Sequence, residues 1–185
     1  MADLGERHAT YDDLLAVPPE LVAEILGGML VTHPRPAPRH AVAASSLGDE
    51  LVGPFQKGRG GPGGWWILDE PELHLGADVL VPDIAGWRRQ RMPAMPETAW
   101  FETPPDWVCE VLSPSTARDD RVVKMPIYAK AEVGHLWLID PDLRTLEVYS
   151  AESGRWVLLE SYRDDARVAP PPFEAIEIGL SELWA

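Results

Sequence analysis

The chain has 185 residues, of which 45% are hydrophobic and 25% charged, and these proportions predict one globular domain spanning 1-185. The formal net charge of −14 argues against a protein that coats nucleic acid nonspecifically, because such binding comes from lysine and arginine displacing phosphate counterions. The single cysteine, Cys109, excludes an intramolecular disulfide and a zinc cluster built from several thiolates of one chain.

The sequence also bears on location and association. It contains no apolar run of about eighteen residues and no signal-peptide pattern, so we expect a cytoplasmic protein without a membrane partner. Cys109 lies in an apolar run, which favours a buried, inert thiol. Eight tryptophans are many for this length. A homodimer interface is one interpretation of them, and core packing explains most of them equally well.

Apolar periodicity and turn residues predict the elements in chain order. They are a capped helix at 10–15, a β-hairpin at 21–31, a helix at 40–55, a glycine-rich surface loop at 57–64, strands at 65–75, 79–87 and 106–112, a helix at 115–130, strands at 135–139, 145–149 and 155–162, and a short helix at 180–184. Gly27 and Gly28 permit the positive φ of a primed hairpin turn. Pro126 predicts a kink in the helix at 115–130, with Val122 and Tyr128 among its core-facing residues. The loop from Arg88 to Pro105 is a long connection of the kind that shields or shapes a site.

Two acidic residues interrupt strands that otherwise look buried. Asp83 follows Pro82 inside an apolar strand, and Glu110 stands within the apolar run from Trp107 to Leu112. Burying an ionised carboxylate is costly unless a cation or hydrogen bonds compensate it. A shared divalent ion would compensate both acids, and carboxylate oxygens are the ligands that magnesium prefers.

For either acid alone, exposure from a one-sided strand or pairing with an arginine is the simpler interpretation. Here two such acids lie on strands that can be neighbours, and the following helix carries Lys124. Together these residues make a metal site as good an interpretation as the simpler one. Taken alone, Lys124 is more simply a solvated helix lysine.

At these positions the chain resembles the Uma-type restriction endonucleases, a bacterial branch of the PD-(D/E)xK nuclease superfamily. The resemblance rests on the following pieces in order: Pro82-Asp83, the run from Pro105 to Thr116 that contains Glu110, Arg118-Asp119, Lys124, Tyr128-Ala129, Val133-Gly134, and the run from Trp137 to Pro141. Glu24 with Gly28, and Pro38 with His40, are weaker matches. The order and spacing hold over most of the chain.

The resemblance implies an α/β (α+β) fold with a restriction-endonuclease-like mixed sheet flanked by helices, preceded by an N-terminal hairpin. It implies Asp83 and Glu110 as catalytic metal ligands for Mg²⁺ or Mn²⁺, with Glu24 near them. An exposed acid on a hairpin strand is an equally good interpretation of Glu24. Leu112 stands where the general motif has its lysine, so the catalytic lysine is assigned to Lys124 on the helix.

The implied reaction is endonucleolytic hydrolysis of DNA phosphodiester bonds, in which the metal activates water and Lys124 orients it or offsets charge. His40, Arg88, Arg89 and Arg91 are candidate substrate contacts. A histidine bonded at a helix end and arginines solvated in a loop are at least as good interpretations of them. Two other functions remain open: a binding module with weak or no catalysis on nucleic acid or protein, and a metal enzyme acting on a small phosphorylated molecule.

Overall fold

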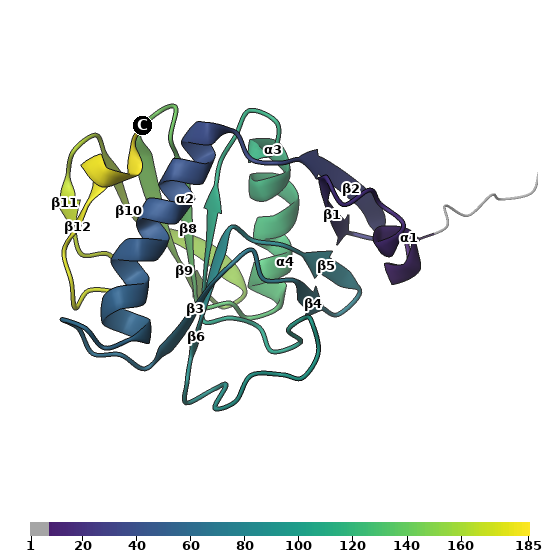
Figure 1. Cartoon of the computed structure of the whole chain (residues 1–185), viewed down its shortest axis with the longest axis horizontal. Helices are drawn as coiled ribbons and strands as arrows, with labels where there is room; N and C mark the ends of the chain where they lie inside the picture. Colours follow the sequence, from purple (N-terminus) through teal and green to yellow (C-terminus); the bar gives the residue numbers. More distant parts are fainter. Residues whose placement is uncertain (1–7) are drawn as a thin grey trace, which may run out of the picture.

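The computed structural model describes residues 8–185, and Figure 1 shows how their elements are arranged. The helical segments are α1 (Tyr11–Leu15), α2 (Pro38–Leu51), α3 (Ala117–Asp119) and α4 (Met125–Lys130), the π-helical turns η1 (Val52–Gln56) and η2 (Asp120–Lys124), and the 3₁₀ helix η3 (Leu180–Leu183). The strands are β1 (Leu21–Leu26), β2 (Met29–Pro34), β3 (Trp65–Asp69), β4 (Leu73–Leu75), β5 (Asp78–Leu80), β6 (Ile84–Arg88), β7 (Trp107–Val111), β8 (His135–Asp140), β9 (Thr145–Glu152), β10 (Arg155–Arg163), β11 (Arg167–Val168) and β12 (Ile178–Gly179). Within the described range, no helix has the length and apolar character needed to cross a membrane.

The strands of residues 8–185 form a larger mixed sheet, a smaller antiparallel sheet and a two-stranded ribbon. The larger sheet has the order β10-β9-β8-β7-β6-β3, and its β7 and β8 pair in parallel. The smaller sheet has the order β2-β1-β5-β4 and lies with α1 at one end of the molecule (Figure 1). The expected mixed sheet flanked by helices and preceded by an N-terminal hairpin is confirmed.

The parallel pairing of β7 with β8 determines where the helical segment between them must lie. A parallel connection requires a crossover, and α3, η2 and α4 provide it between β7 and β8. Side chains alternate between the faces of β7: Trp107 and Cys109 pack into the core beneath α2, whereas Val108 packs into the core beneath α4. Glu110 shares the face of Val108, so it points toward the crossover helix.

The N-terminal elements form as their sequence predicts. Thr10 caps α1, accepting the backbone N–H of Asp13, while the Asp13 carboxylate accepts the backbone N–H of Thr10. Gly27 and Gly28 have φ values of 60° and 83°, the left-handed pair that a type I′ hairpin turn requires. The hairpin register pairs Glu24 with Val31 and so fixes the face on which Glu24 lies.

The expected single strands at 65–75 and 79–87 are wrong, because each is divided between the two sheets. β3 and β6 belong to the larger sheet, and β4 and β5 belong to the smaller one. Pro71 and Pro82 stand at the breaks, where proline removes the N–H that a continuing central strand would need. The chain therefore crosses between the sheets twice, and the second crossing places Asp83 where the two sheets meet.

The crossover helix begins near the expected residue but differs inside. A π-helical turn, η2, stands directly before α4, whose second residue, Pro126, cannot donate a hydrogen bond to the preceding turn. Val122 was expected to face the core and is instead 66% exposed. Besides Ala129, the buried residues are Asp120, Lys124 and Tyr128, and these three share one face at four-residue spacing and leave Val122 on the other.

Phe173 joins the C-terminal segment to the larger sheet. Its ring lies between 4.6 and 5.6 Å, centroid to centroid, from the rings of Phe55, Trp65, Trp107 and Trp137. Trp137 Nε1 also donates a 2.8 Å hydrogen bond to the carbonyl of Pro171 in the same segment. Core packing thus accounts for several of the tryptophans, while the homodimer stays a prediction.

We expect Phe173→Ala to lower the free energy of unfolding by about 3–5 kcal/mol, because it removes a fully buried ring and leaves a cavity among four aromatic side chains. Urea unfolding followed by tryptophan fluorescence measures the change. Leu159→Ala is the matched control, since Leu159 is 43% exposed and should change stability by less than about 0.5 kcal/mol. Equal effects of the two substitutions would contradict this role for Phe173.

Candidate active site

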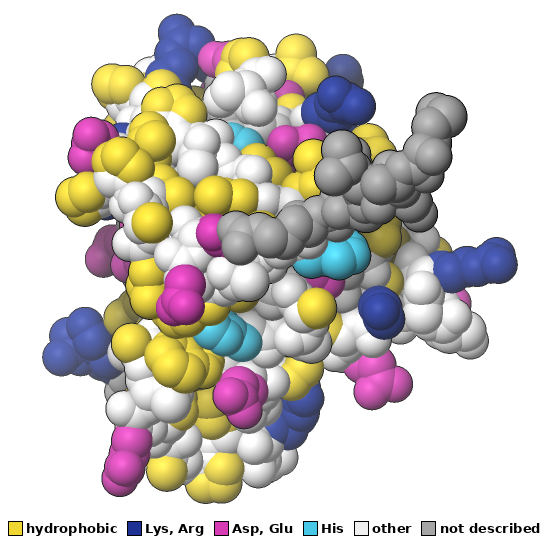
Figure 2. Space-filling view, turned by 90° about the vertical axis from the view of Figure 1, so that its right-hand side faces the viewer, with side chains coloured by type: hydrophobic (Ala, Val, Ile, Leu, Met, Phe, Trp, Pro, Cys, Tyr) yellow, Lys and Arg dark blue, Asp and Glu magenta, His cyan; other side chains and the backbone are white. Residues whose placement is uncertain are grey.

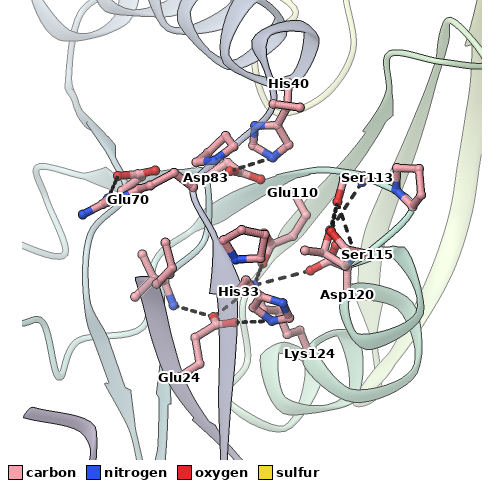
Figure 3. A pocket seen from close by; sticks show the side chains of 18 residues that line it. Glu24, His33, His40, Glu70, Asp83, Glu110, Ser113, Ser115, Asp120 and Lys124 are labelled. Atoms are coloured by element: carbon pink, nitrogen blue, oxygen red, sulfur yellow. Dashed lines mark hydrogen bonds and ion pairs between the residues drawn. The ribbon is translucent and has the colours of Figure 1, made fainter. Parts of the chain in front are cut away.

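A cavity of about 270 Å³ lies where the smaller sheet, the start of α2 and the crossover helix meet (Figure 3). Its lining combines acids, histidines and small hydroxyl residues: Val22, Glu24, His33, Pro34, Arg35, Pro36, Ala37, His40, Glu70, Val81, Asp83, Glu110, Ser113, Pro114, Ser115, Thr116, Asp120 and Lys124. The predicted Glu24, His40, Asp83, Glu110 and Lys124 all lie in this one cavity.

Lys124 occupies the centre of a group of carboxylates. Its Nζ lies 3.0 Å from Glu24 Oε1, 3.2 Å from Glu110 Oε1 and 3.4 Å from Asp120 Oδ1, and the residue is 4% exposed. Burial lowers the pKa of Lys124, but the charges of Glu110, Glu24 and Asp120 outweigh burial and hold that pKa well above its usual value. The neighbouring carboxylates therefore favour the charged ammonium, which links the crossover helix that carries it to the strands β1 and β7.

Glu110 is held from two sides on the strand β7. Tyr128 donates its hydroxyl to Glu110 Oε1 at 2.6 Å, and Lys124 Nζ donates to the same oxygen. Burial raises the pKa of Glu110 well above its usual range, Lys124 opposes the rise, and the nearby Asp120 and Asp83 add to it. The carboxyl group thus lies in a site with more negative charge than its one lysine neutralises.

Asp120 is a site residue that the sequence interpretation missed. It is 3% exposed, and burial raises its pKa, opposed mainly by Lys124. The available signal was its spacing of four residues from Lys124 and eight from Tyr128, which puts all three on one helix face. The π-helical turn between Asp120 and Lys124 is a device often found at functional sites.

Asp83 and His40 form the opposite side of the cavity (Figure 3). His40 Nε2 lies 3.1 Å from Asp83 Oδ1, and Asp83 Oδ2 accepts the backbone N–H of Val111 at 2.7 Å. Burial lowers the pKa of His40, but the hydrogen bond and the charge of Asp83 more than offset this and leave it raised. His40 Nδ1 is buried without a hydrogen-bond partner among the described residues. The first turns of α2 thus fix the orientation of one candidate ligand.

Glu24 is 1% exposed and belongs to the site rather than to an exposed hairpin face. Its Oε1 accepts the backbone N–H of Val81 at 2.8 Å. His33 Nε2 lies 3.7 Å from Glu24 Oε2, a second residue that the sequence interpretation missed. The signal was strand alternation, because His33 pairs across the hairpin with Val22, which lines the same cavity.

The residues fit a hard divalent cation by donor type and charge. Five carboxyl groups, one arginine and one lysine line the cavity, together with two histidines. The formal charge is −3 when every carboxyl group is ionised and both histidines are neutral. Carboxylate oxygens are the ligands that Mg²⁺ and Mn²⁺ take. Among the described residues, no three or more His, Cys, Asp or Glu side chains are already arranged around a common metal position. The donors are present, but three of them bond Lys124 instead.

The arginines proposed as substrate contacts lie away from the cavity, whose lining includes none of them. Arg88 Cζ stands 4.5 Å from the ring centroid of Trp65, and Arg89 Cζ stands 3.8 Å from that of Trp66. Arg91 pairs with Asp106. No other residue of the loop from Arg88 to Pro105 lines the cavity within the described chain. Substrate contact by these arginines stays a prediction, and their described contacts are structural.

Arg121 fastens the crossover helix to the larger sheet beside the site. It donates two hydrogen bonds, of 2.8 and 3.1 Å, to the Glu147 carboxylate on β9, which lower the pKa of Glu147. Stability from this pair is therefore full above the ordinary glutamate pKa of about 4.3 and is lost as pH falls through the lower folded value.

The Arg121–Glu147 pair should make the free energy of unfolding fall at acidic pH, and we expect Glu147→Gln to abolish that part of the fall. The part is worth about 0.2–1 kcal/mol, because both side chains are partly solvated. Urea unfolding at a series of pH values from neutral to strongly acidic measures it. The control is Asp164→Asn, because Asp164 belongs to an exposed ion pair with Arg163. An unchanged pH profile of stability in Glu147→Gln would contradict a stabilising role for the Arg121–Glu147 pair.

We expect Lys124→Met to lower the free energy of unfolding by about 3–5 kcal/mol in the presence of EDTA, because it leaves three carboxyl groups buried around an apolar side chain. Asp120→Asn should be neutral or stabilising under the same conditions, since it removes one of the excess negative charges and keeps the shape. Denaturant unfolding of both variants measures the difference. Comparable destabilisation by the two substitutions would show that Lys124 is not the limiting charge.

Comparisons with known proteins agree with this architecture. Among solved structures, the chain is similar to a protein described as a putative nuclease belonging to DUF820 from Anabaena variabilis ATCC 29413. The two are 25% identical, the TM-score is 0.75, and the match covers 95% of this chain and 97% of that one. A search of curated proteins gives no match. A family model described as "Uma2: Putative restriction endonuclease" matches residues 8–181, so the chain belongs to the Uma2 family of putative restriction endonucleases.

Proposed function

We propose that this protein is a metal-dependent endonuclease that hydrolyses phosphodiester bonds of DNA with Mg²⁺ or Mn²⁺. The observation that carries the proposal is the position of Glu110, buried on a central strand, 3.2 Å from Lys124 and in one cavity with Asp83 and Glu24. The family name and the description of the Anabaena protein as a putative nuclease support the same reaction class.

The charge of the cavity supports the metal requirement independently. A phosphodiester is an anion, and it would enter a space lined by five carboxyl groups and two bases. Like charges at close range in a poorly solvated site repel strongly. A bound divalent cation reverses the local field, so an anionic substrate and an acidic cavity become compatible when such an ion is present.

The residues of the chain have separable parts in this proposal. Asp83 and Glu110 would hold the ion, with Glu24 as a third donor, and the ion when bound supplies an activated water and stabilises charge on phosphoryl oxygens. Lys124 supplies a fixed positive charge beside the reacting phosphate. Tyr128 fixes the rotamer of Glu110, and His40 fixes that of Asp83, as outer partners of metal ligands do.

A non-catalytic binding module on the same fold is the second candidate. One observation favours it: Glu24, Glu110 and Asp120 bond Lys124 rather than surrounding a common metal position among the described residues. In that case the carboxylates would serve stability alone. Metal binding separates the two candidates directly.

We expect calorimetric titration with Mg²⁺ or Mn²⁺ to show binding by the wild type and none by an Asp83→Asn, Glu110→Gln double variant, which keeps shape and removes two donor charges. Cleavage of labelled DNA should disappear with it. Glu160→Gln, on the exposed edge strand β10, is the control and should retain both. A wild type that binds neither ion would reject the metal nuclease and favour the binding module.

We expect Tyr128→Phe to lower metal affinity or cleavage by about 10–100-fold, because the hydroxyl that orients Glu110 is lost while the ring still fills the core. Calorimetry and cleavage rates under identical conditions measure the effect. Tyr162→Phe, a control on β10 away from the cavity, should leave both unchanged. Unchanged affinity and rate in Tyr128→Phe would show that Glu110 needs no such support.

A further inference from the structure

The dimensions of the cavity restrict the substrate. Its volume is about 270 Å³, below the range of about 300–1,000 Å³ that is usual for pockets holding drug-sized ligands. Glu110 and Glu24, which the proposed reaction uses, line this cavity and are only 2% and 1% exposed. The cavity therefore has room for little more than one phosphodiester unit, inserted from outside.

An intact duplex does not present its backbone in a way that suits such a cavity. Its phosphates lie on the outside of a stiff rod whose bending is costly, so they reach surface sites and cannot individually leave the helix. Enzymes that act on a base within a duplex extrude its nucleotide and bear the cost of unpairing it, and drawing one backbone unit of a duplex into a cavity would carry a similar cost. A single strand is flexible and can fold one backbone unit inward.

The distribution of positive charge gives a second, independent restriction. Duplex binding depends on many lysine and arginine contacts to phosphates, but Arg35 and Lys124 are the two such residues in the described lining, and Lys124 is enclosed by carboxylates. On the face shown in Figure 2, lysine and arginine side chains stand apart among hydrophobic and acidic ones. Others are engaged by acids, such as Arg39 by Asp142.

Arg35 is placed to contact a strand that enters the cavity. It lines the cavity and its side chain is 59% exposed. It donates a hydrogen bond to the carbonyl of Pro19 at 2.9 Å and lies 4.0 Å from Glu70. The prolines on either side of it, Pro34 and Pro36, have fixed φ and stiffen the segment that carries it.

From these two restrictions we infer that the site accepts single-stranded DNA, as a free strand, a flap or a strand end, and excludes intact duplex, with Arg35 contacting the entering backbone. The inference rests on the proposed function and narrows its substrate. It also makes the net charge of −14 consistent with a nuclease, because a single strand that inserts one phosphate needs few cationic contacts.

The test compares one labelled oligonucleotide in three forms with Mn²⁺: as a single strand, as a blunt duplex, and as a duplex with a single-stranded flap. We expect cleavage of the single strand, and cleavage of the flapped form within its single-stranded part. The blunt duplex should react at least about tenfold more slowly, because base pairs must first open. Equal rates on the blunt duplex and the single strand would overturn the inference and leave the nuclease proposal intact.

Binding provides a readout that does not depend on turnover. In the Asp83→Asn, Glu110→Gln variant the cavity has lost two carboxylates, so the repulsion that the ion would otherwise offset is reduced. Fluorescence anisotropy with this variant should show tighter binding of the single strand than of the duplex. In that background, Arg35→Ala should reduce the slope of log affinity against log salt by about 0.7. Arg39→Ala is the matched control, because Arg39 is exposed on the same segment and does not line the cavity.

The outcomes keep the two proposals distinguishable. Equal loss of salt dependence in Arg35→Ala and Arg39→Ala would remove Arg35 from the substrate path. Absence of cleavage with every form and with both Mg²⁺ and Mn²⁺ would overturn the nuclease. The anisotropy comparison would then still decide the inference, because equal binding of single strand and duplex overturns it and a preference for the single strand supports it.

Discussion

The buried ammonium of Lys124 is the constraint on which the site and much of the surrounding structure depend. An isolated charge in a protein interior is costly, and here three carboxylates compensate it at 3.0 to 3.4 Å. Glu24 comes from the smaller sheet, Glu110 from the larger one and Asp120 from the crossover helix. The same interaction that makes the charge tolerable therefore holds together elements that are far apart in the sequence, and the cavity lies where they converge.

Backbone groups reinforce this convergence at the second acidic position. Asp83 stands where Pro82 ends one strand and the chain passes to the other sheet. Its carboxylate accepts the N–H of Val111, and its carbonyl accepts the N–H of Glu70. The proline break, which leaves neighbouring backbone groups without ladder partners, thus also positions a candidate metal ligand. Fold and site share these bonds, so a substitution at Asp83 affects both.

Sequence reasoning found the residues whose signals are local and missed those whose signals depend on neighbours in space. Glu110 is conspicuous because an acid inside an apolar strand demands compensation, and the type I′ hairpin follows from two adjacent glycines. The strand breaks escaped notice because the apolar runs continue through Pro71 and Pro82 into a different sheet. Arg88 suggested a phosphate contact because its sequence context is basic, but antiparallel pairing of β3 with β6 places it opposite Trp65. That register is a tertiary fact which no local pattern carries.

The site must satisfy two opposing electrostatic demands. Without a divalent ion, clustered carboxylates destabilise a folded chain, and Lys124 offsets part of that repulsion while burial keeps the pKa of Glu110 and of Asp120 raised. In the proposed metal nuclease, the same excess of negative charge would supply the affinity for the divalent ion. One lysine among several acids is thus a compromise. A second lysine would compete with the ion, whereas a cavity without any lysine would leave the negative charge uncompensated during folding. Under that proposal, a cavity of this charge would admit an anionic backbone together with a cation, and its size would favour admitting that backbone one unit at a time.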